Sequence, residues 1–246
     1  MFWGVIKSVA GWIFVVVGTV ALSLSGILIF WPICLVFERA SGRLPHQVSQ
    51  FWARTLSALL PFWEIRCEGR EKIRKDKAYV VVSNHQSLLD IMVVLAQLPL
   101  HFKFIAKREL FWIPFFGWHL FASGYIPLKR GDAESGRCCL EKARHWLARG
   151  VSVLFFPEGT RSPDGQVREF KVGAFKLAEE TGAEILPVVI KGTRDAIPKH
   201  SWVVKKRAVI HLKALDPISI PDPSQNLESI RDRVRTIMIR ELNQIQ

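Results

Sequence analysis

Two residues of a short polar segment, His85 and Asp90, have types and a spacing that could move a proton. The segment, residues 84–90 (NHQSLLD), follows an apolar run typical of a buried strand and precedes a helical pattern. In one continuous helix the two side chains would point about 140° apart. They can meet only if His85 lies in the loop before the helix and Asp90 lies in the first helical turn. We expect Ser87 to be the N-cap, which makes Asp90 the third helical residue and lets it fold back toward the loop.

Contact between these two side chains would create a general base. Asp90 would fix the tautomer of the His85 ring and stabilise its protonated form, so that the ring could take a proton from a hydroxyl group. The segment alone is explained more simply by a capping-box aspartate beside an ordinary loop histidine. Ser87 as a covalent nucleophile is a lesser alternative, and the sequence has no G-x-S-x-G elbow to favour it. It also has no H-E-x-x-H pattern, and we expect no metal.

A second polar segment, residues 155–162 (FFPEGTRS), opens where another apolar strand ends at Pro157. Ligands of open α/β sheets bind at the carboxyl edge of the strands, where such a loop would lie. Arg161 can bind a phosphate through two parallel hydrogen bonds, and Gly159 allows a ligand to approach the backbone closely. Alone, this segment too is explained more simply, as a turn after a buried strand.

Together, the two segments resemble motifs of the 1-acylglycerol-3-phosphate acyltransferase family, part of the wider glycerolipid acyltransferase superfamily. The pattern N-H-x4-D and the later F-P-E-G-T-R-S stand in the family's order. Further stretches are similar to family features: residues 107–110 (KREL) with Pro114 and Gly117, 124–130 (GYIPLKR), 170–173 (FKVG) and 185–190 (ILPVVI). The match at 124–130 is looser, because Pro127 and Lys129 stand where an aromatic and an acidic residue are common.

The resemblance implies transfer of a fatty acyl chain to the sn-2 hydroxyl of lysophosphatidic acid, giving phosphatidic acid in phospholipid biosynthesis. The donor would be an acyl thioester, either acyl-CoA or acyl-carrier protein, and no other cofactor is implied. His85 would be the general base and Asp90 its partner. Backbone N–H groups after Ser87 would stabilise the oxyanion. The remaining positions would serve the acceptor: Lys107, Arg130 and Arg161 bind its phosphate, Glu158, Gly159 and Thr160 shape its site, and Pro187 supports the site through the sheet.

Several other functions compete with this interpretation. Another lysophospholipid, lyso-ornithine lipid or glycerol 3-phosphate could replace lysophosphatidic acid as the acceptor. A non-enzymatic membrane-binding protein would be expected to have lost His85 or Asp90, and both are present. A nucleic-acid-binding protein is suggested only by charge, since no recognisable nucleic-acid-binding motif accompanies it.

Strand and helix patterns alternate from residue 66 onward, which predicts a catalytic domain over residues 66–246. Its fold class would be α/β, with a largely parallel mixed sheet flanked by helices, as in glycerolipid acyltransferases. We expect strands at 78–83, 103–106, 125–128, 151–156, 185–190 and 208–213. We expect helices at 87–97, 134–149, 171–181 and 225–244.

Residues 1–65 are predicted to form a membrane anchor of one or two helices. No charged residue lies between Lys7 and Glu38, a stretch longer than the ~20 apolar residues that span a bilayer. It fits a tilted spanning helix or a hairpin in one leaflet, bent near Gly26 or Pro32; a cleaved signal peptide is a lesser alternative. Residues 46–63 predict an amphipathic helix, either on the membrane surface or in the core. Its apolar face would be Val48, Phe51, Trp52, Leu56, Leu59 and Leu60.

Composition favours an anionic membrane as partner and argues against nucleic acid. Lys and Arg outnumber Asp and Glu by 34 to 22, and nine Trp residues suit a membrane interface. Basic residues between positions 199 and 207 predict contact with lipid headgroups, or a solvated loop. The aromatic stretch 111–121 could enter lipid, line an acyl channel or pack in the core. Cationic residues after the apolar stretch, and four cysteines without metal or disulfide spacing, place the catalytic domain on the cytoplasmic side of the membrane.

Overall fold

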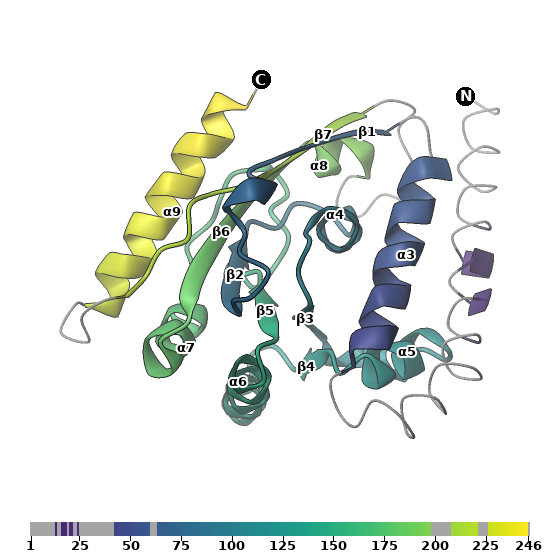
Figure 1. The fold of residues 1–246 in the computed structure, drawn as a ribbon, viewed down its shortest axis with the longest axis horizontal. Helices are drawn as coiled ribbons and strands as arrows, with labels where there is room; N and C mark the ends of the chain where they lie inside the picture. Colours follow the sequence, from purple (N-terminus) through teal and green to yellow (C-terminus); the bar gives the residue numbers. More distant parts are fainter. Residues whose placement is uncertain are drawn as a thin grey trace.

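The computed structural model describes residues 42–59, 63–197, 208–220 and 226–245, with a few positions between 13 and 24. In this part of the chain, seven strands form one sheet in the order β1-β7-β6-β2-β5-β3-β4 (Figure 1). The strands are β1 (Trp63–Glu68), β2 (Tyr79–Ser83), β3 (Phe102–Lys107), β4 (Ile126–Leu128), β5 (Ser152–Phe155), β6 (Glu184–Lys191) and β7 (Ala208–Ala214).

Five neighbouring strands, β6, β2, β5, β3 and β4, run parallel. Their carboxyl ends therefore meet at one edge of the sheet. β7 pairs antiparallel with β6, and β1 pairs parallel with β7. The predicted largely parallel α/β sheet is confirmed. Strand β1 was not predicted, and it begins at Trp63, so it crosses the boundary expected between residues 65 and 66.

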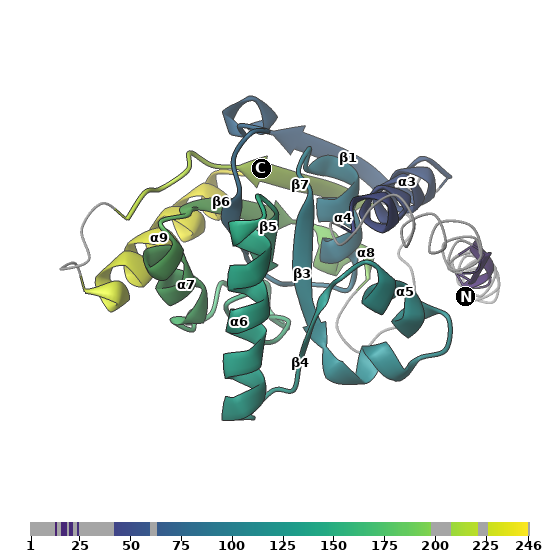
Figure 2. The same cartoon turned by 60° about the horizontal axis from the view of Figure 1, so that its bottom comes forward.

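Helices cover both faces of the sheet (Figure 2). One layer holds α3 (Arg43–Leu59), α4 (Leu89–Gln97) and α5 (Phe116–Ala122), and the other holds α6 (Ala133–Ala148), α7 (Gly173–Thr181) and α9 (Leu227–Gln244). Alternation along β2 explains the two layers: Val80 and Val82 pack with the second, and Tyr79 and Val81 with the first. Short elements complete the described chain: η2 (Arg70–Lys72), η3 (Arg108–Trp112) and α8 (Thr193–Ala196).

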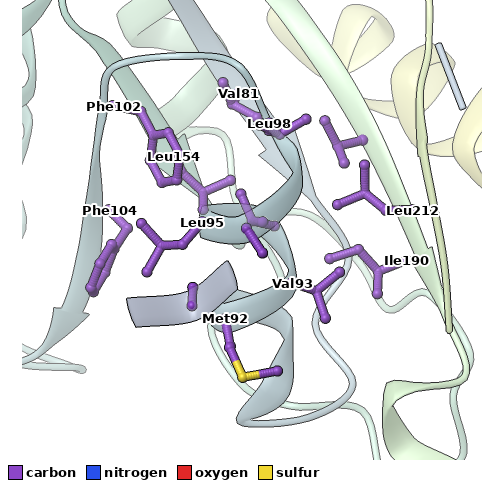
Figure 3. Close-up of a cluster of buried hydrophobic side chains, with 14 of the residues drawn as sticks. Val81, Met92, Val93, Leu95, Leu98, Phe102, Phe104, Leu154, Ile190 and Leu212 are labelled. Carbon is purple, nitrogen blue, oxygen red and sulfur yellow. The ribbon is translucent and has the colours of Figure 1, made fainter. Parts of the chain in front are cut away.

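The core beneath α4 fixes the helix whose first turn carries Asp90. Val93 and Leu95 of α4 are buried in a cluster that includes Phe102 and Leu154 of the sheet (Figure 3). Each such side chain contributes about 1.5–3 kcal/mol on burial. Because α4 is anchored along its length, the position of its first turn relative to the sheet edge is determined by packing.

Helix α3 is in part a core helix, which resolves one of the open alternatives. Ala53 and Leu56 are buried in the cluster shared with α4, whereas Phe51 is exposed.

A polar contact also joins α3 to α5: Ser49 Oγ lies 2.7 Å from His119 Nε2. Burial lowers the pKa of His119 to about 4, so this ring is neutral at physiological pH. Helix α3 starts three residues before the predicted helix, and residues 60–62 are outside the described chain.

Predictions for two segments fall outside the described residues. They are the uncharged stretch between Lys7 and Glu38, apart from the few positions noted above, and the basic run between 199 and 207. No helix in the described ranges has both the length and the apolar character needed to cross a bilayer.

The aromatic stretch 111–121 belongs in part to the core, one of its predicted roles. Phe111 and Leu120 are buried in the core. By contrast, Trp112 is 73% exposed, Trp118 52% and Phe121 61%. One side of η3 and α5 therefore packs on the sheet, and the other presents aromatic rings at the surface.

Candidate active site

The predicted contact between His85 and Asp90 is present. Ring atom Nδ1 of His85 lies 2.7 Å from Oδ2 of Asp90, with His85 in the loop after β2 and Asp90 in the first turn of α4. The Asp90 side chain is fully buried, whereas 13% of the His85 side chain is exposed. The other ring nitrogen, Nε2, makes no hydrogen bond within the described part of the chain, so it can meet a ligand. Phe156 stacks on the ring with 4.2 Å between centroids and holds its plane.

The carboxylate of Asp90 is held by four hydrogen bonds. Besides His85, its Oδ2 accepts the backbone N–H groups of Gln86 at 2.6 Å and Ser87 at 2.9 Å. Its Oδ1 accepts the hydroxyl of Thr193 at 2.5 Å. Thr193 begins α8 and is fully buried, and no motif in the sequence indicated it. The chain can pass close to β7 just before Thr193 only because residue 192 is a glycine: a Cβ there would lie 2.0 Å from the carbonyl oxygen of Val209.

Ser87 does not take either role considered for it. The N-cap position belongs to Leu88, and Asp90 is the second helical residue instead of the third. The hydroxyl of Ser87 is buried and donates to the carbonyl of Ile197 at 2.8 Å. Because that proton is already engaged in a buried bond, Ser87 is poorly placed to act as a nucleophile.

Glu158, in the turn that follows the neighbouring strand β5, secures the backbone of His85. Its Oε1 accepts the N–H of His85 at 2.8 Å, and its Oε2 accepts the N–H of Arg168 at 3.1 Å. Burial raises the pKa of the Glu158 carboxyl above its usual range, although both backbone donors act against this. The carbonyl of His85 in turn accepts the N–H of Ser162 at 2.7 Å. Glu158 therefore positions the histidine, a role the sequence did not suggest.

Asn84 joins the same loop to β6. Its side-chain amide donates to the carbonyl of Ile190 and accepts the N–H of Ile190, both at 2.8 Å. This residue was noted only as part of a motif. The loop that carries His85 is therefore fastened to strands on both sides of β2.

The cations expected to bind phosphate lie further along the sheet edge. Lys107 ends β3 and Arg130 follows β4, and both are exposed. Glu109 lies between them: its pKa is lowered first by its own backbone N–H and then by Lys107 and Arg130. The structure records no contact between Lys107 or Arg130 and the His85 loop.

The turn after Glu158 presents Gly159, Thr160 and Arg161 at partly exposed positions beside that loop. Gly159 has a left-handed backbone (φ 69). A Cβ there would lie 3.2 Å from Nζ of Lys171, so this lysine lies over the turn. Lys171 stands in the FKVG stretch and is a further cation at the site. Among the described residues, no group of His, Cys, Asp and Glu side chains is arranged to hold a metal ion.

The arrangement can perform general-base chemistry on a ligand that carries an anionic group. A histidine with one free nitrogen is oriented by a buried carboxylate, and cations stand at the same sheet edge. Fold and site together fit an α/β enzyme whose histidine could act as a general base on a hydroxyl group.

Comparison with known proteins places the chain in a family. The acyltransferase family profile matches residues 64–191. The chloroplast 1-acyl-sn-glycerol-3-phosphate acyltransferase of Arabidopsis thaliana is 41% identical over 185 residues, covering 73% of this chain and 51% of that protein. The human 1-acyl-sn-glycerol-3-phosphate acyltransferase alpha is 34% identical over 189 residues, covering 74% of this chain and 64% of that protein.

A solved structure is similar over nearly the whole chain. The crystal structure of the 1-acyl-sn-glycerophosphate (LPA) acyltransferase of Thermotoga maritima has a TM-score of 0.76 and 30% identity, covering 95% of each chain. The chain belongs to the acyltransferase family. It spans less than two thirds of the length of these plant and human relatives.

Proposed function

We propose that this protein transfers a fatty acyl chain from an acyl thioester to the sn-2 hydroxyl of lysophosphatidic acid, which gives phosphatidic acid. The observation that carries the proposal is the His85–Asp90 contact, with Nε2 of His85 open at the carboxyl edge of the sheet. The names of its plant, human and Thermotoga relatives support this acceptor. The donor would be acyl-CoA or acyl-carrier protein.

The proposed reaction needs one base and no acyl-enzyme. Nε2 of His85 takes the proton of the acceptor hydroxyl as the oxygen attacks the thioester carbonyl. The tetrahedral intermediate then collapses, the carbon–sulfur bond breaks, and the thiolate receives the proton from the His85 ring. Asp90 keeps Nδ1 protonated and carries the opposite charge while the ring is a cation.

The backbone N–H groups after Ser87, expected to stabilise the oxyanion, are engaged in part. Leu89 donates to the hydroxyl of Ser87 at 3.4 Å, and Asp90 donates to the carbonyl of Ser87 at 3.3 Å. Stabilisation of the oxyanion by the N–H of Leu88, the remaining group of this stretch, stays a prediction.

The acceptor phosphate is assigned to the cations at the sheet edge. Arg161 lies three residues after Glu158, which accepts the N–H of His85. Lys107 is the last residue of β3, and Arg130 follows β4. Arg161 has the planar donors that bind phosphate bidentately. Gly159 and Thr160 of the same turn would border the acceptor, as the sequence suggested.

The preference for a phosphate-bearing acceptor tests the function directly. With an acyl thioester as donor, we expect kcat/KM for lysophosphatidic acid to exceed that for a monoacylglycerol of the same chain by about tenfold or more, because charge-assisted hydrogen bonds to the phosphate are lost. The measurement is product formation from a radiolabelled donor in detergent micelles. A higher kcat/KM for lyso-ornithine lipid, another lysophospholipid or glycerol 3-phosphate would reassign the acceptor.

The protein would act at a membrane, with its catalytic domain on the cytoplasmic side. The aromatic surface of η3 and α5, formed by Trp112, Ile113, Trp118 and Phe121, is exposed. Exposed Lys107 and Arg108 directly precede it. Aromatic rings beside cations suit the interface of a bilayer that contains anionic lipid.

Contact with lipid should be visible in tryptophan fluorescence. In proteoliposomes with brominated phospholipids, we expect Trp112→Phe and Trp118→Phe, combined, to remove part of the quenchable emission, because these rings would lie at the depth of the bromine atoms. Trp146→Phe is the matched control, since Trp146 packs in the α6 layer. Equal quenching in the wild type and the double variant would contradict this orientation.

A further inference from the structure

A pocket lies beside the catalytic loop, on the side of β6 and α9. Its volume is ≈ 560 Å³, and its walls include Gln86, which follows His85, and Gly192, which precedes Thr193. Helix α9 forms the outer wall along β6 (Figure 1). The pocket therefore adjoins the loop that carries His85 and the start of α8, where Thr193 donates to Asp90. None of the residues assigned to the acceptor lines it.

Three cations line this pocket: Lys191, Arg194 and Arg235. Each donates to backbone carbonyls: Lys191 to Ile245, Arg194 to Asp164 at 2.7 Å, and Arg235 to Val167 and Arg168, both at 2.8 Å. None of the three forms an ion pair with a carboxylate in the described part of the chain. Neutral carbonyls leave their positive charge uncompensated, and each arginine keeps N–H donors for a ligand.

Two carboxylates also line the pocket, and in the described part of the chain neither forms an ion pair with the three cations. Asp164 accepts the hydroxyl of Ser162 at 2.6 Å and the N–H of Gln166 at 3.1 Å, and Asp195 is exposed. The cations outnumber the carboxylates in the lining. Such a site suits a ligand with an anionic group.

The order of the strands places this pocket on the side of β2 opposite Lys107 and Arg130, two of the cations assigned to the acceptor phosphate. His85 follows β2, with β6 on one side and β5, β3 and β4 on the other. Lys107 and Arg130 stand at β3 and β4, whereas the pocket lies at β6. A transfer between two substrates needs both of them beside one base. The acceptor phosphate on one side leaves the other side for the donor.

The rest of the lining also fits a donor. The lining includes Gln86, Gln166 and Asn243, which carry side-chain amides, and the apolar residues Ile239 and Leu242. The phosphopantetheine arm shared by CoA and acyl-carrier protein has the matching groups: a phosphate, two amides and a gem-dimethyl carbon. Its thiol end carries the acyl group that must reach His85.

We propose that the pocket between α9 and residues 164–167 binds the phosphopantetheine arm of the acyl donor, with its phosphate at Arg194, Arg235 and Lys191. The proposal rests on the proposed acyl transfer. It extends that function by assigning a donor site, which neither the motifs nor the relatives supply.

The test is equilibrium binding to the full-length protein in detergent, with CoA, 4′-phosphopantetheine and pantetheine as probes. The wild type should bind the two phosphate-bearing probes more tightly than pantetheine. Arg194→Gln should weaken their binding about tenfold and leave pantetheine unchanged, because a charge-assisted contact is lost. Arg233→Gln is the matched control: Arg233 is exposed on α9 and does not line the pocket.

A second variant avoids removing any native contact. Asn243 is exposed at the end of α9, and Asn243→Glu adds a negative charge to the pocket. We expect it to weaken binding of the same two probes. Gln244→Glu, one residue later and outside the lining, should have little effect.

Kinetics then separate the two substrates and the two proposals. In active protein, Arg194→Gln should raise the KM for acyl-CoA and leave the KM for lysophosphatidic acid unchanged. A higher KM for lysophosphatidic acid alone, or no change in binding for either variant, would overturn the donor assignment. Phosphate-dependent CoA binding that both variants weaken, in a wild type that transfers no acyl group, would support the pocket and contradict the proposed function.

Discussion

Replacing His85 with alanine should lower the rate of acyl transfer to lysophosphatidic acid by about 10²–10⁴-fold, the usual contribution of a general base. The hydroxyl is a poor nucleophile until its proton is removed, and Nε2 of His85 is the nitrogen available to remove it. The fall should appear in kcat, since the side chain is not assigned to the phosphate of either substrate. The measurement is initial velocity with a radiolabelled acyl thioester.

This variant should fold, which makes the result interpretable. The bonds from Glu158 and Ser162 reach the backbone of His85 and survive the substitution. Asp90 keeps the N–H groups of Gln86 and Ser87. His145→Ala is the matched control, because His145 is exposed on α6. Equal activity in His85→Ala and the wild type, with matching circular dichroism, would rule out the base.

The pair at the centre of the site could be predicted because its two residues are close in the sequence. His85 and Asp90 lie five positions apart, so a loop followed by a helix is enough to bring them together. Thr193 and Ile190 reach the same loop from more than a hundred residues away. Their contacts exist because β6 lies beside β2, and strand order does not follow from a motif. Glu158 was found by its motif, but its backbone partners depend on β5 lying on the other side of β2.

Strands and helices buried on the sheet were predicted within a few residues, because each carries a strong apolar period. Strand β1 was missed although Trp63, Ile65 and Cys67 alternate with charged residues, a signal of a strand that pairs at an edge. Its first three residues were assigned to the predicted membrane anchor, since an amphipathic pattern precedes them. The antiparallel direction of β7 depends on how the chain returns after α8, which has no local signature.

Replacing Asp90 with asparagine should cost nearly as much activity as losing the base, about 10²–10⁴-fold in kcat. Oδ2 of Asp90 accepts three N–H donors, from the His85 ring, Gln86 and Ser87. If the NH2 group of the asparagine faced these three donors, its hydrogens would clash with theirs. If the carbonyl oxygen of the asparagine faced them instead, the negative charge that balances the protonated ring would still be absent. The amide group would then face the hydroxyl of Thr193.

The surface variant Asp76→Asn serves as the control, because it removes a carboxylate whose partner is the exposed Arg74. Asp90→Asn should leave the KM for both substrates within about twofold, since Asp90 is fully buried and touches neither substrate. A parallel rise of both KM values with unchanged kcat would instead show that the carboxylate only shapes the loop.

Thr193 supplies a graded version of the same test, because it acts on Asp90 from the side away from the histidine. Thr193→Val keeps the volume and removes the hydroxyl that donates to Oδ1 at 2.5 Å. A hydrogen bond to a charged group is worth about 1.5–3 kcal/mol, so we expect kcat to fall about tenfold or somewhat more, with KM unchanged. Thr193→Ser keeps the donor and should keep most of the rate. If the valine variant were as active as the wild type and the serine variant were impaired, packing of the methyl group would be what matters and the hydrogen bond would have no part in catalysis. A rate that follows the hydroxyl would show that the end of β6 orients the carboxylate, so that strands on both sides of β2 hold the catalytic pair in place.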